Sequence, residues 1–65
     1  MKIELNGQVI TTEASTLAEL LHLQQIDSNC VACALNGDFI PRARYATQPI
    51  EAGCQLEVLA PMQGG

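Results

Sequence analysis

The chain ends in Ala60-Pro61-Met62-Gln63-Gly64-Gly65, and this ending is the stretch best suited to do chemistry. We expect Gly65 to carry a free α-carboxylate, which is ionised at neutral pH. A carboxylate is a poor acyl donor until one of its oxygens becomes part of a leaving group. Attack on the α-phosphate of ATP would make an acyl-adenylate, which a sulfur or nitrogen nucleophile can then open. Gly65 is therefore the predicted reactive residue.

Such a tail must enter the active site of another protein to be activated. Glycines let the backbone pass a narrow channel and adopt angles that are closed to other residues. Pro61 stiffens the exit from the last ordered segment, and five extended residues reach roughly 17 Å. We therefore assign presentation of the reactive end to Pro61, Met62, Gln63 and Gly64. The alternative is a frayed terminus, because chain ends are commonly disordered.

Three cysteines and one histidine are the rival candidates for chemistry. Cys30 and Cys33 have C-x-x-C spacing, but redox motifs of this kind usually lie at a helix N-terminus, which lowers the thiol pKa. We interpret this segment as the start of a strand, where side chains three apart point to opposite faces. Adding Cys54 and His22 gives a nominal Cys3His zinc set, but nothing in the spacing supports it. We expect core cysteines and no metal site.

The composition limits the class of protein. With 65 residues, 48% hydrophobic and 15% charged, the chain is expected to form one globular domain. The net charge of −4, with only Lys2, Arg42 and Arg44 positive, argues against nucleic acid as a partner. No apolar stretch is long enough to cross a membrane, and no signal peptide is visible. The odd cysteine count favours reduced thiols, so we expect a cytoplasmic protein.

The first half of the chain predicts a hairpin followed by a helix. Residues 1–6 alternate polar and apolar side chains, as in a half-buried strand. Asn6-Gly7 favours a two-residue turn, so residues 8–12 return as the second strand with Ile10 opposite Ile3 and facing the core. A longer loop would put Val9 there instead.

Thr16 and Glu19 have the spacing of a capping box at the start of a helix. The helix is predicted to run to about Gln25 and to be ended by residues 27–29. Its apolar face is made by Leu17, Leu20 and Leu21.

The second half of the chain predicts three more strands, at residues 30–35, 39–40 and 55–60. Asn36-Gly37 marks a second turn, and Pro41 stops the short strand. We expect residues 41–53 to be irregular. Alternation puts Val31, Cys33, Leu35, Leu56 and Val58 inward.

The outward positions of these strands carry a group of apolar residues. A contiguous apolar group beside the tail indicates an interface. We therefore predict a partner-docking patch formed by Ala32, Ala34, Phe39 and Leu59. Ordinary exposed surface is the alternative, since single exposed apolar residues are common.

The element order gives an α+β class with two layers. One helix packs against a mixed sheet of four to five strands within a domain of residues 1–60. We expect residues 61–65 to form a flexible Gly-Gly tail.

The chain resembles the ubiquitin-like β-grasp sulfur carriers of bacterial thiamin (thiazole) synthesis. The resemblance covers nearly the whole chain and rests on residues 3–7, 16–21, 34–42 and 56–65, together with Tyr45. Its most specific parts are Asn-Gly-x-x-Ile-Pro-Arg and the Ala-Pro-Met-Gln-Gly-Gly ending. The resemblance also implies that the first and last strands are parallel neighbours in the centre of the sheet.

The resemblance implies a role for Gly65 and a set of partners. An ATP-dependent activating enzyme related to ubiquitin-activating (E1) enzymes would adenylate the carboxylate. Sulfur from a persulfide, which a cysteine desulfurase can supply, would convert it to a thiocarboxylate. Thiazole synthase would take that sulfur. The protein would be a co-substrate without turnover of its own, and ATP would be used by the activating enzyme with no cofactor bound here.

One departure and three alternatives remain. The turn before the last strand is Ala52-Gly53-Cys54, where this family commonly has Asp-Gly-Asp, and we expect the fold to survive because the glycine is kept. A carrier for molybdopterin synthesis has a similar fold and tail. A binding module that is never activated and a small thiol redox protein are alternatives of other classes.

Overall fold

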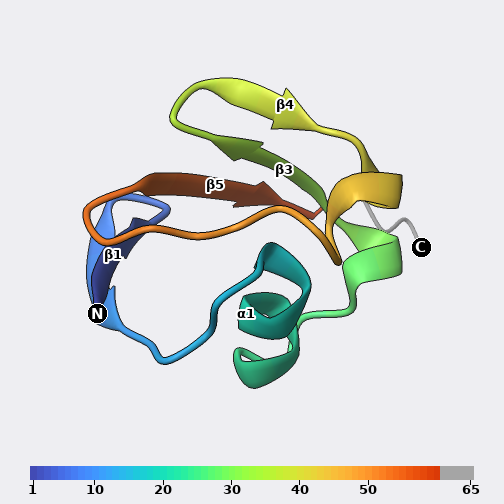
Figure 1. The fold of residues 1–65 in the computed structure, drawn as a ribbon. Coiled ribbons are helices and arrows are strands. Elements are labelled where there is room, and N and C mark those ends of the chain that lie inside the picture. Colours follow the sequence, from blue (N-terminus) through green and yellow to red (C-terminus); the bar gives the residue numbers. More distant parts are fainter. Residues whose placement is uncertain (61–65) are drawn as a thin grey trace.

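The computed structural model describes residues 1–60, which form one five-stranded sheet and one α-helix (Figure 1). The strands are β1 (Lys2–Leu5), β2 (Gln8–Thr11), β3 (Ala32–Leu35), β4 (Asp38–Ile40) and β5 (Gln55–Leu59). The helical segments are α1 (Leu17–Leu23) and two 3-10 helices, η1 (Ser28–Cys30) and η2 (Arg42–Arg44). The strand order is β2-β1-β5-β3-β4. The predicted mixed sheet packed on one helix is confirmed.

The two Asn-Gly turns behave as their residue types dictate. Both residues of each turn have positive φ, at 53° and 81° for Asn6-Gly7 and at 52° and 88° for Asn36-Gly37. This conformation suits the right-handed twist of the strands that the turn joins. The first turn places Ile3 opposite Ile10, which confirms the predicted register. Local turn chemistry therefore accounts for both antiparallel edges of the sheet.

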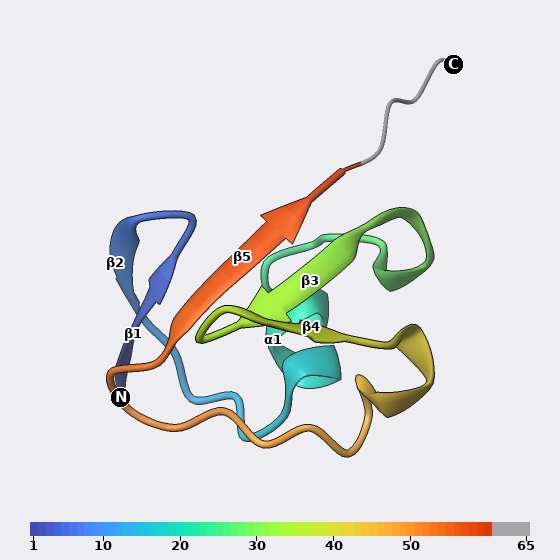
Figure 2. The ribbon, with the colours of Figure 1, turned by 90° about the horizontal axis from the view of Figure 1, so that it is seen from above.

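The last strand lies between strands from both ends of the chain. Figure 2 shows β5 crossing the middle of the sheet between β1 and β3. It is parallel to β1 and antiparallel to β3, so the expected central pairing of the first and last strands is confirmed. The turn before β5 keeps Gly53 at a φ of 83°, and the strand forms despite the changed neighbours of that glycine.

The core lies between the sheet and α1 (Figure 1). The helix contributes its apolar face, whose three leucines are at most 1% exposed, and the sheet contributes the inward residues of its central strands. Full burial of a leucine stabilises the fold by roughly 1.5–3 kcal/mol. The residues that meet here are Leu17, Leu20, Leu21, Ile3, Cys33, Leu56 and Val58.

The start of α1 follows the predicted capping box with one difference. The Thr16 hydroxyl accepts from the Glu19 N–H at 3.2 Å. The Glu19 carboxylate reaches back to the Ser15 N–H at 2.9 Å, one residue before the N-cap. That backbone hydrogen bond lowers the pKa of Glu19. The local sequence therefore determines where the helix begins.

The end of α1 was predicted wrongly. The helix stops at Leu23, and Gln25 adopts a left-handed φ of 61°. The Gln25 N–H donates to the His22 C=O at 3.0 Å, and the Ile26 N–H donates to the Leu21 C=O at 2.9 Å. This is a Schellman motif with glutamine at the position that glycine usually takes. The Asp27 carboxylate caps η1 by accepting from the Asn29 N–H, and it does not end α1.

Replacing Gln25 by glycine should stabilise the protein. The left-handed conformation strains a residue with a Cβ, and relief of that strain exceeds the entropy cost of glycine by about 0.5–1 kcal/mol. The measurement is the urea midpoint followed by circular dichroism. Gln24→Gly is the matched control, because Gln24 has a φ of −87° and glycine should destabilise there. A shift in the same direction for both variants would contradict this reading.

Two further segments differ from the sequence expectation by more than one residue. Cys30 ends η1, and the strand begins at Ala32, so the segment from Cys30 to Cys33 is not one continuous strand. Residues 41–53 contain η2, which the irregular assignment missed. Tyr45 follows η2 and is buried, and its hydroxyl donates to the Val31 C=O at 3.1 Å. Burial of Tyr45 in the core therefore holds residues 41–53 in place, although their sequence gives little indication of helix or strand.

Stability should fall at high pH because of Tyr45. Burial, with the neighbouring Cys33 thiol, raises the pKa of Tyr45 from 10.0 to about 12. Above pH 10 the unfolded chain loses the phenol proton while the folded chain keeps it, so stability decreases from about pH 10 to about pH 12. Tyr45→Phe should show a smaller decrease. Urea midpoints measured across this range test the prediction.

The chain has a single tyrosine, so tyrosinate absorbance follows Tyr45 directly. The folded protein should titrate at higher pH than the urea-unfolded protein. The pKa of the buried Cys33 thiol is also raised, mainly by burial, and this thiol remains in the Phe variant. The Tyr45→Phe variant should therefore still lose some stability as the pH rises. Parallel stability curves for the two proteins would show that Tyr45 does not carry the effect.

Candidate functional site

The described part of the site is the end of β5 and the sheet face beside it. β5 ends at Leu59, and Ala60 is the last described residue. The predicted reactive Gly65 lies outside the described residues, as do the four predicted presentation residues Pro61, Met62, Gln63 and Gly64. The structure therefore shows what holds the base of the tail.

The central position of β5 fixes that base. Leu56 and Val58 are buried against the helix side, and Glu57 and Leu59 are exposed on the other face, as predicted. Pairing with β3 continues to the last residue of the strand, where Leu59 lies opposite Ala32. The chain thus reaches Ala60 from a strand that is anchored in the core and bonded to its neighbours.

The four predicted docking residues lie together on the face of the sheet opposite α1. Ala32 pairs with Leu59 of β5, and Ala34 pairs with Phe39 of β4, so the two pairs meet on β3. Phe39 is 68% exposed and Leu59 is 67% exposed. We call Ala32, Ala34, Phe39 and Leu59 the outer apolar patch. Its role in docking remains a prediction, whereas its contiguity beside the base of the tail is a feature of the fold.

Charged residues lie around the outer apolar patch. Glu57 lies opposite Ala34 on the same face, and is exposed. Arg42 and Arg44 are exposed on η2, which follows β4 directly. A pocket of about 400 Å³ lies beside β4, and its lining includes Arg44, Gln48 and the inward-facing Ile40, so it is not part of the outer apolar patch. A partner on this face therefore meets apolar side chains with the Glu57 carboxylate beside them, while the two arginines lie on the neighbouring η2.

The cysteines do not form a thiol centre. Cys30 is exposed, whereas Cys33 and Cys54 are buried, and all three are free. The Cys30 thiol donates to Asp27 Oδ2 at 3.5 Å, and that bond raises the pKa of Cys30. Reactive thiols need a lowered pKa. Cys30 lies in η1 and Cys33 lies in β3, and for this reason the two C-x-x-C sulfurs differ in burial. We had expected the sulfurs to diverge because of alternation along a single strand.

The nominal zinc set is not assembled. His22 lies on the exposed side of α1, while Cys33 and Cys54 lie in the core. Across residues 1–60, no three His, Cys, Asp or Glu side chains are close enough together to hold a metal ion. In the same part of the chain, no helix has the length and apolarity needed to span a membrane.

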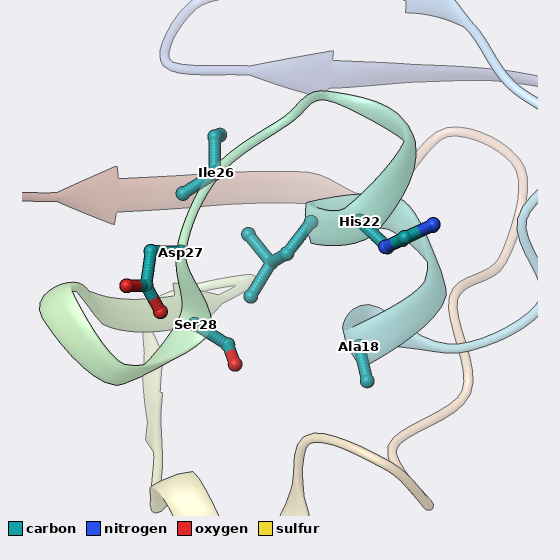
Figure 3. A pocket seen from close by; sticks show the side chains of 6 residues that line it. Ala18, His22, Ile26, Asp27 and Ser28 are labelled. Atoms are coloured by element: carbon teal, nitrogen blue, oxygen red, sulfur yellow. The ribbon is translucent and has the colours of Figure 1, made fainter.

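A second pocket, of about 240 Å³, lies between α1 and η1 (Figure 3). Leu21, Ala18 and Ile26 supply its apolar lining. His22 and Asp27 lie on opposite sides of this pocket and do not point toward each other. The lining therefore contains no paired acid and base.

Two asparagines have contacts that the sequence interpretation missed. The sequence indicates only a turn role for Asn6 and Asn36, but both side chains also bond to the backbone of β5. The Asn6 contacts join residues 52 positions apart. No local pattern indicates such a contact, because it depends on the pairing of the first and last strands.

Comparisons with known proteins agree with this geometry. The model of the ThiS family matches residues 2–65. A crystal structure of the thiamine biosynthesis protein ThiS from Geobacter metallireducens has a TM-score of 0.86 at 26% identity, with 100% of both chains covered. An NMR solution structure of a thiamine biosynthesis protein from the same organism has a TM-score of 0.81 at 26% identity, covering 100% of this chain and 88% of that chain. No match to a curated protein was found.

The comparisons bear on the whole chain. The family match spans both hairpins, the helix, the central strand and the Gly-Gly ending. The similarity of the folds extends over every element of the sheet. The resemblance on which the β-grasp prediction rested is therefore confirmed, and the chain belongs to the ThiS family.

Proposed function

We propose that this protein is a sulfur carrier in thiamin biosynthesis and that the α-carboxylate of Gly65 carries the sulfur. The observation that carries the proposal is the family match, which runs from residue 2 through Gly65. The similar structures are of thiamine biosynthesis proteins, which supports the pathway. The anchored end of β5 supports the role of the following residues, because it provides a firm base from which a tail can reach a partner.

The proposed chemistry has three steps: activation of the carboxylate, transfer of sulfur to the acyl carbon, and reduction of the resulting disulfide. A carboxylate oxygen attacks the α-phosphorus of ATP, pyrophosphate leaves, and an acyl-adenylate forms. The terminal sulfur of a persulfide then attacks the acyl carbon, AMP leaves, and an acyl disulfide forms. A thiol reduces that disulfide, releasing the thiocarboxylate and a new disulfide. ATP and the catalytic groups belong to the activating enzyme, so this chain acts as a protein co-substrate and binds no cofactor.

The outer apolar patch is the proposed docking face for the E1-like activating enzyme. Its large side chains, Phe39 and Leu59, are about two-thirds exposed, and Leu59 is the last residue of β5, next to the base of the tail. Exposed aromatic and aliphatic side chains are effective anchors when a partner covers them. Docking on this patch would direct residues 61–65 toward the partner. This would reduce the conformational entropy lost when the tail enters the active site of the activating enzyme.

The remaining partners follow from the same proposal. A cysteine desulfurase supplies the persulfide sulfur, and thiazole synthase accepts the sulfur from the thiocarboxylate. Residues 61–65 would act as a flexible tail on a domain of residues 1–60. The acidic chain would work in the cytoplasm without contacting nucleic acid or membrane. The thiol redox alternative has little support, since the pKa of Cys30 and of Cys33 is raised.

An intact-mass experiment tests the function. The protein is incubated with the activating enzyme of a thiamin pathway, ATP and a persulfide source. We expect a mass increase equal to the exchange of one oxygen for sulfur, located at Gly65 by fragmentation. An unchanged mass, with an enzyme that modifies its own carrier under the same conditions, would refute the proposal. Modification only by an activating enzyme of molybdopterin synthesis would assign the protein to that pathway.

A further inference from the structure

The C-terminal end of β5 continues past the last residue of β1 that pairs with it. The Glu4 N–H donates to the Cys54 C=O, and the Asn6 N–H donates to the Leu56 C=O, both at 2.9 Å. β1 ends at Leu5, and the chain then turns away into the hairpin. The next backbone unit of β5 that faces this side is Val58, which is only 8% exposed. Buried backbone groups need partners, and the backbone of β1 no longer supplies them.

The side chain of Asn6 supplies both partners. Its Oδ1 accepts from the Val58 N–H at 2.8 Å, and its Nδ2 donates to the Val58 C=O at 3.2 Å. A carboxamide carries one acceptor and two donor hydrogens, so it can replace a peptide group at the end of a ladder. The φ of 53° that the turn imposes on Asn6 is also one that asparagine tolerates well. One residue thus makes the turn and completes the ladder.

These contacts lie at the point where the proposed tail begins. The opposite side of β5 is paired with β3, with Val58 opposite Cys33 and Leu59 opposite Ala32. The end of β5 is therefore held from both sides, by Asn6 through the backbone of Val58 and by β3 through its pairing with the strand. The residue after it is Leu59 of the outer apolar patch, and the residue after that is Ala60.

We propose that Asn6 is a positioning residue for sulfur transfer, which fixes Val58 and thereby the docking side chain of Leu59 and the base of the tail. This inference rests on the proposed function. The carboxamide holds the last residues of β5 in the arrangement that the activating enzyme binds. Without it, the end of the strand is held from one side only, and binding must restore the order that was lost.

Asn36 provides a matched control within the same chain. It occupies the same turn position with a φ of 52°, and its side chain also bonds to β5. Its Oδ1 accepts from the Gln55 N–H at 2.9 Å, at the start of the strand and away from the tail. Glycine keeps both turns, because it adopts positive φ freely. Asn6→Gly and Asn36→Gly therefore remove the same kind of contact from opposite ends of β5.

Amide hydrogen exchange tests the contact itself. In Asn6→Gly, protection of the Val58 amide should fall about tenfold relative to the Glu4 amide, since buried hydrogen bonds are expensive to leave unmade. In Asn36→Gly the loss should appear at Gln55 and not at Val58. Asn6→Asp keeps the Oδ1 acceptor and should partly restore Val58. An equal loss at Glu4 and Val58 in Asn6→Gly would mean a general loss of stability and would overturn the proposal.

Kinetics with the activating enzyme test the consequence for function. Asn6→Gly should raise the KM for the carrier by about fivefold or more while kcat changes less than about twofold, because binding must reorder the end of β5. Asn36→Gly should leave both within about twofold of the wild type. Equal effects of the two variants, or an unchanged KM in Asn6→Gly, would overturn the positioning role. If the wild type is not modified at all, the proposed function fails, and the exchange experiment still decides the contact.

Discussion

Deletion of Gly65 is expected to lower thiocarboxylate formation by at least about 100-fold, because a displacement of even 1 Å from the reacting geometry can cost that much. The shortened chain still ends in a carboxylate, now on Gly64. That carboxylate is one residue, roughly 3.5 Å, nearer the domain. It can no longer reach the α-phosphate of ATP from the same docked position. The measurement is the initial rate of the mass change at the terminus.

The fold should be unaffected by this deletion. Every side chain of the described core lies between Ile3 and Val58. The urea midpoint of the variant should therefore match that of the wild type. The variant also keeps the outer apolar patch, so we expect it to compete with the wild type for the activating enzyme. Transfer at the wild-type rate by the shortened chain would rule out the tail mechanism.

Replacing Leu59 by glutamate is expected to weaken binding to the activating enzyme by at least about tenfold, as for loss of an interface anchor. Leu59 is 67% exposed, so the free protein accommodates the charge. In the proposed complex the same carboxylate would be taken out of water without a partner, which is unfavourable. The dissociation constant, measured by titration calorimetry without ATP, checks the prediction.

Val9→Glu is the matched control for this substitution. Val9 is 61% exposed and lies opposite Glu4 on the same face of the sheet, but on the edge strand β2. Both variants gain the same charge, and both should fold, because exposed substitutions usually change stability by less than about 0.5 kcal/mol. Equal weakening by both would attribute the effect to net charge. Unchanged binding of Leu59→Glu would exclude the outer apolar patch as the docking face.

The elements that the sequence predicted best are those whose signals are local. Asn6-Gly7 and Asn36-Gly37 require positive φ at adjacent positions, and few other residue pairs accept it. Thr16 and Glu19 satisfy the first N–H groups of the helix within a single turn. Alternation along residues 55–59 correctly separated inward from outward side chains. These features need no knowledge of the rest of the chain.

The errors lie where a residue adopts a conformation that its type does not favour. Gln25 takes the left-handed position at the end of α1, which glycine or asparagine would have indicated. Cys30 belongs to a 3-10 helix whose cap, Asp27, was interpreted as a helix terminator. Backbone bonds at the end of α1 and the Asp27 cap of η1 close these turns, and no residue type in the segment marks them as clearly as glycine would.

The ending Gly64-Gly65 and the motifs of the resemblance determined the family and the proposed chemistry from the sequence alone. Only the tertiary structure decided what holds that ending in place. Periodicity indicates which way a side chain points, but not which strands are neighbours. The grouping of Phe39 with Leu59 and the bonds from Asn6 to Val58 exist because β5 inserts between β1 and β3. Such contacts join distant parts of the chain, so their energies depend on the assembled sheet and leave no local pattern.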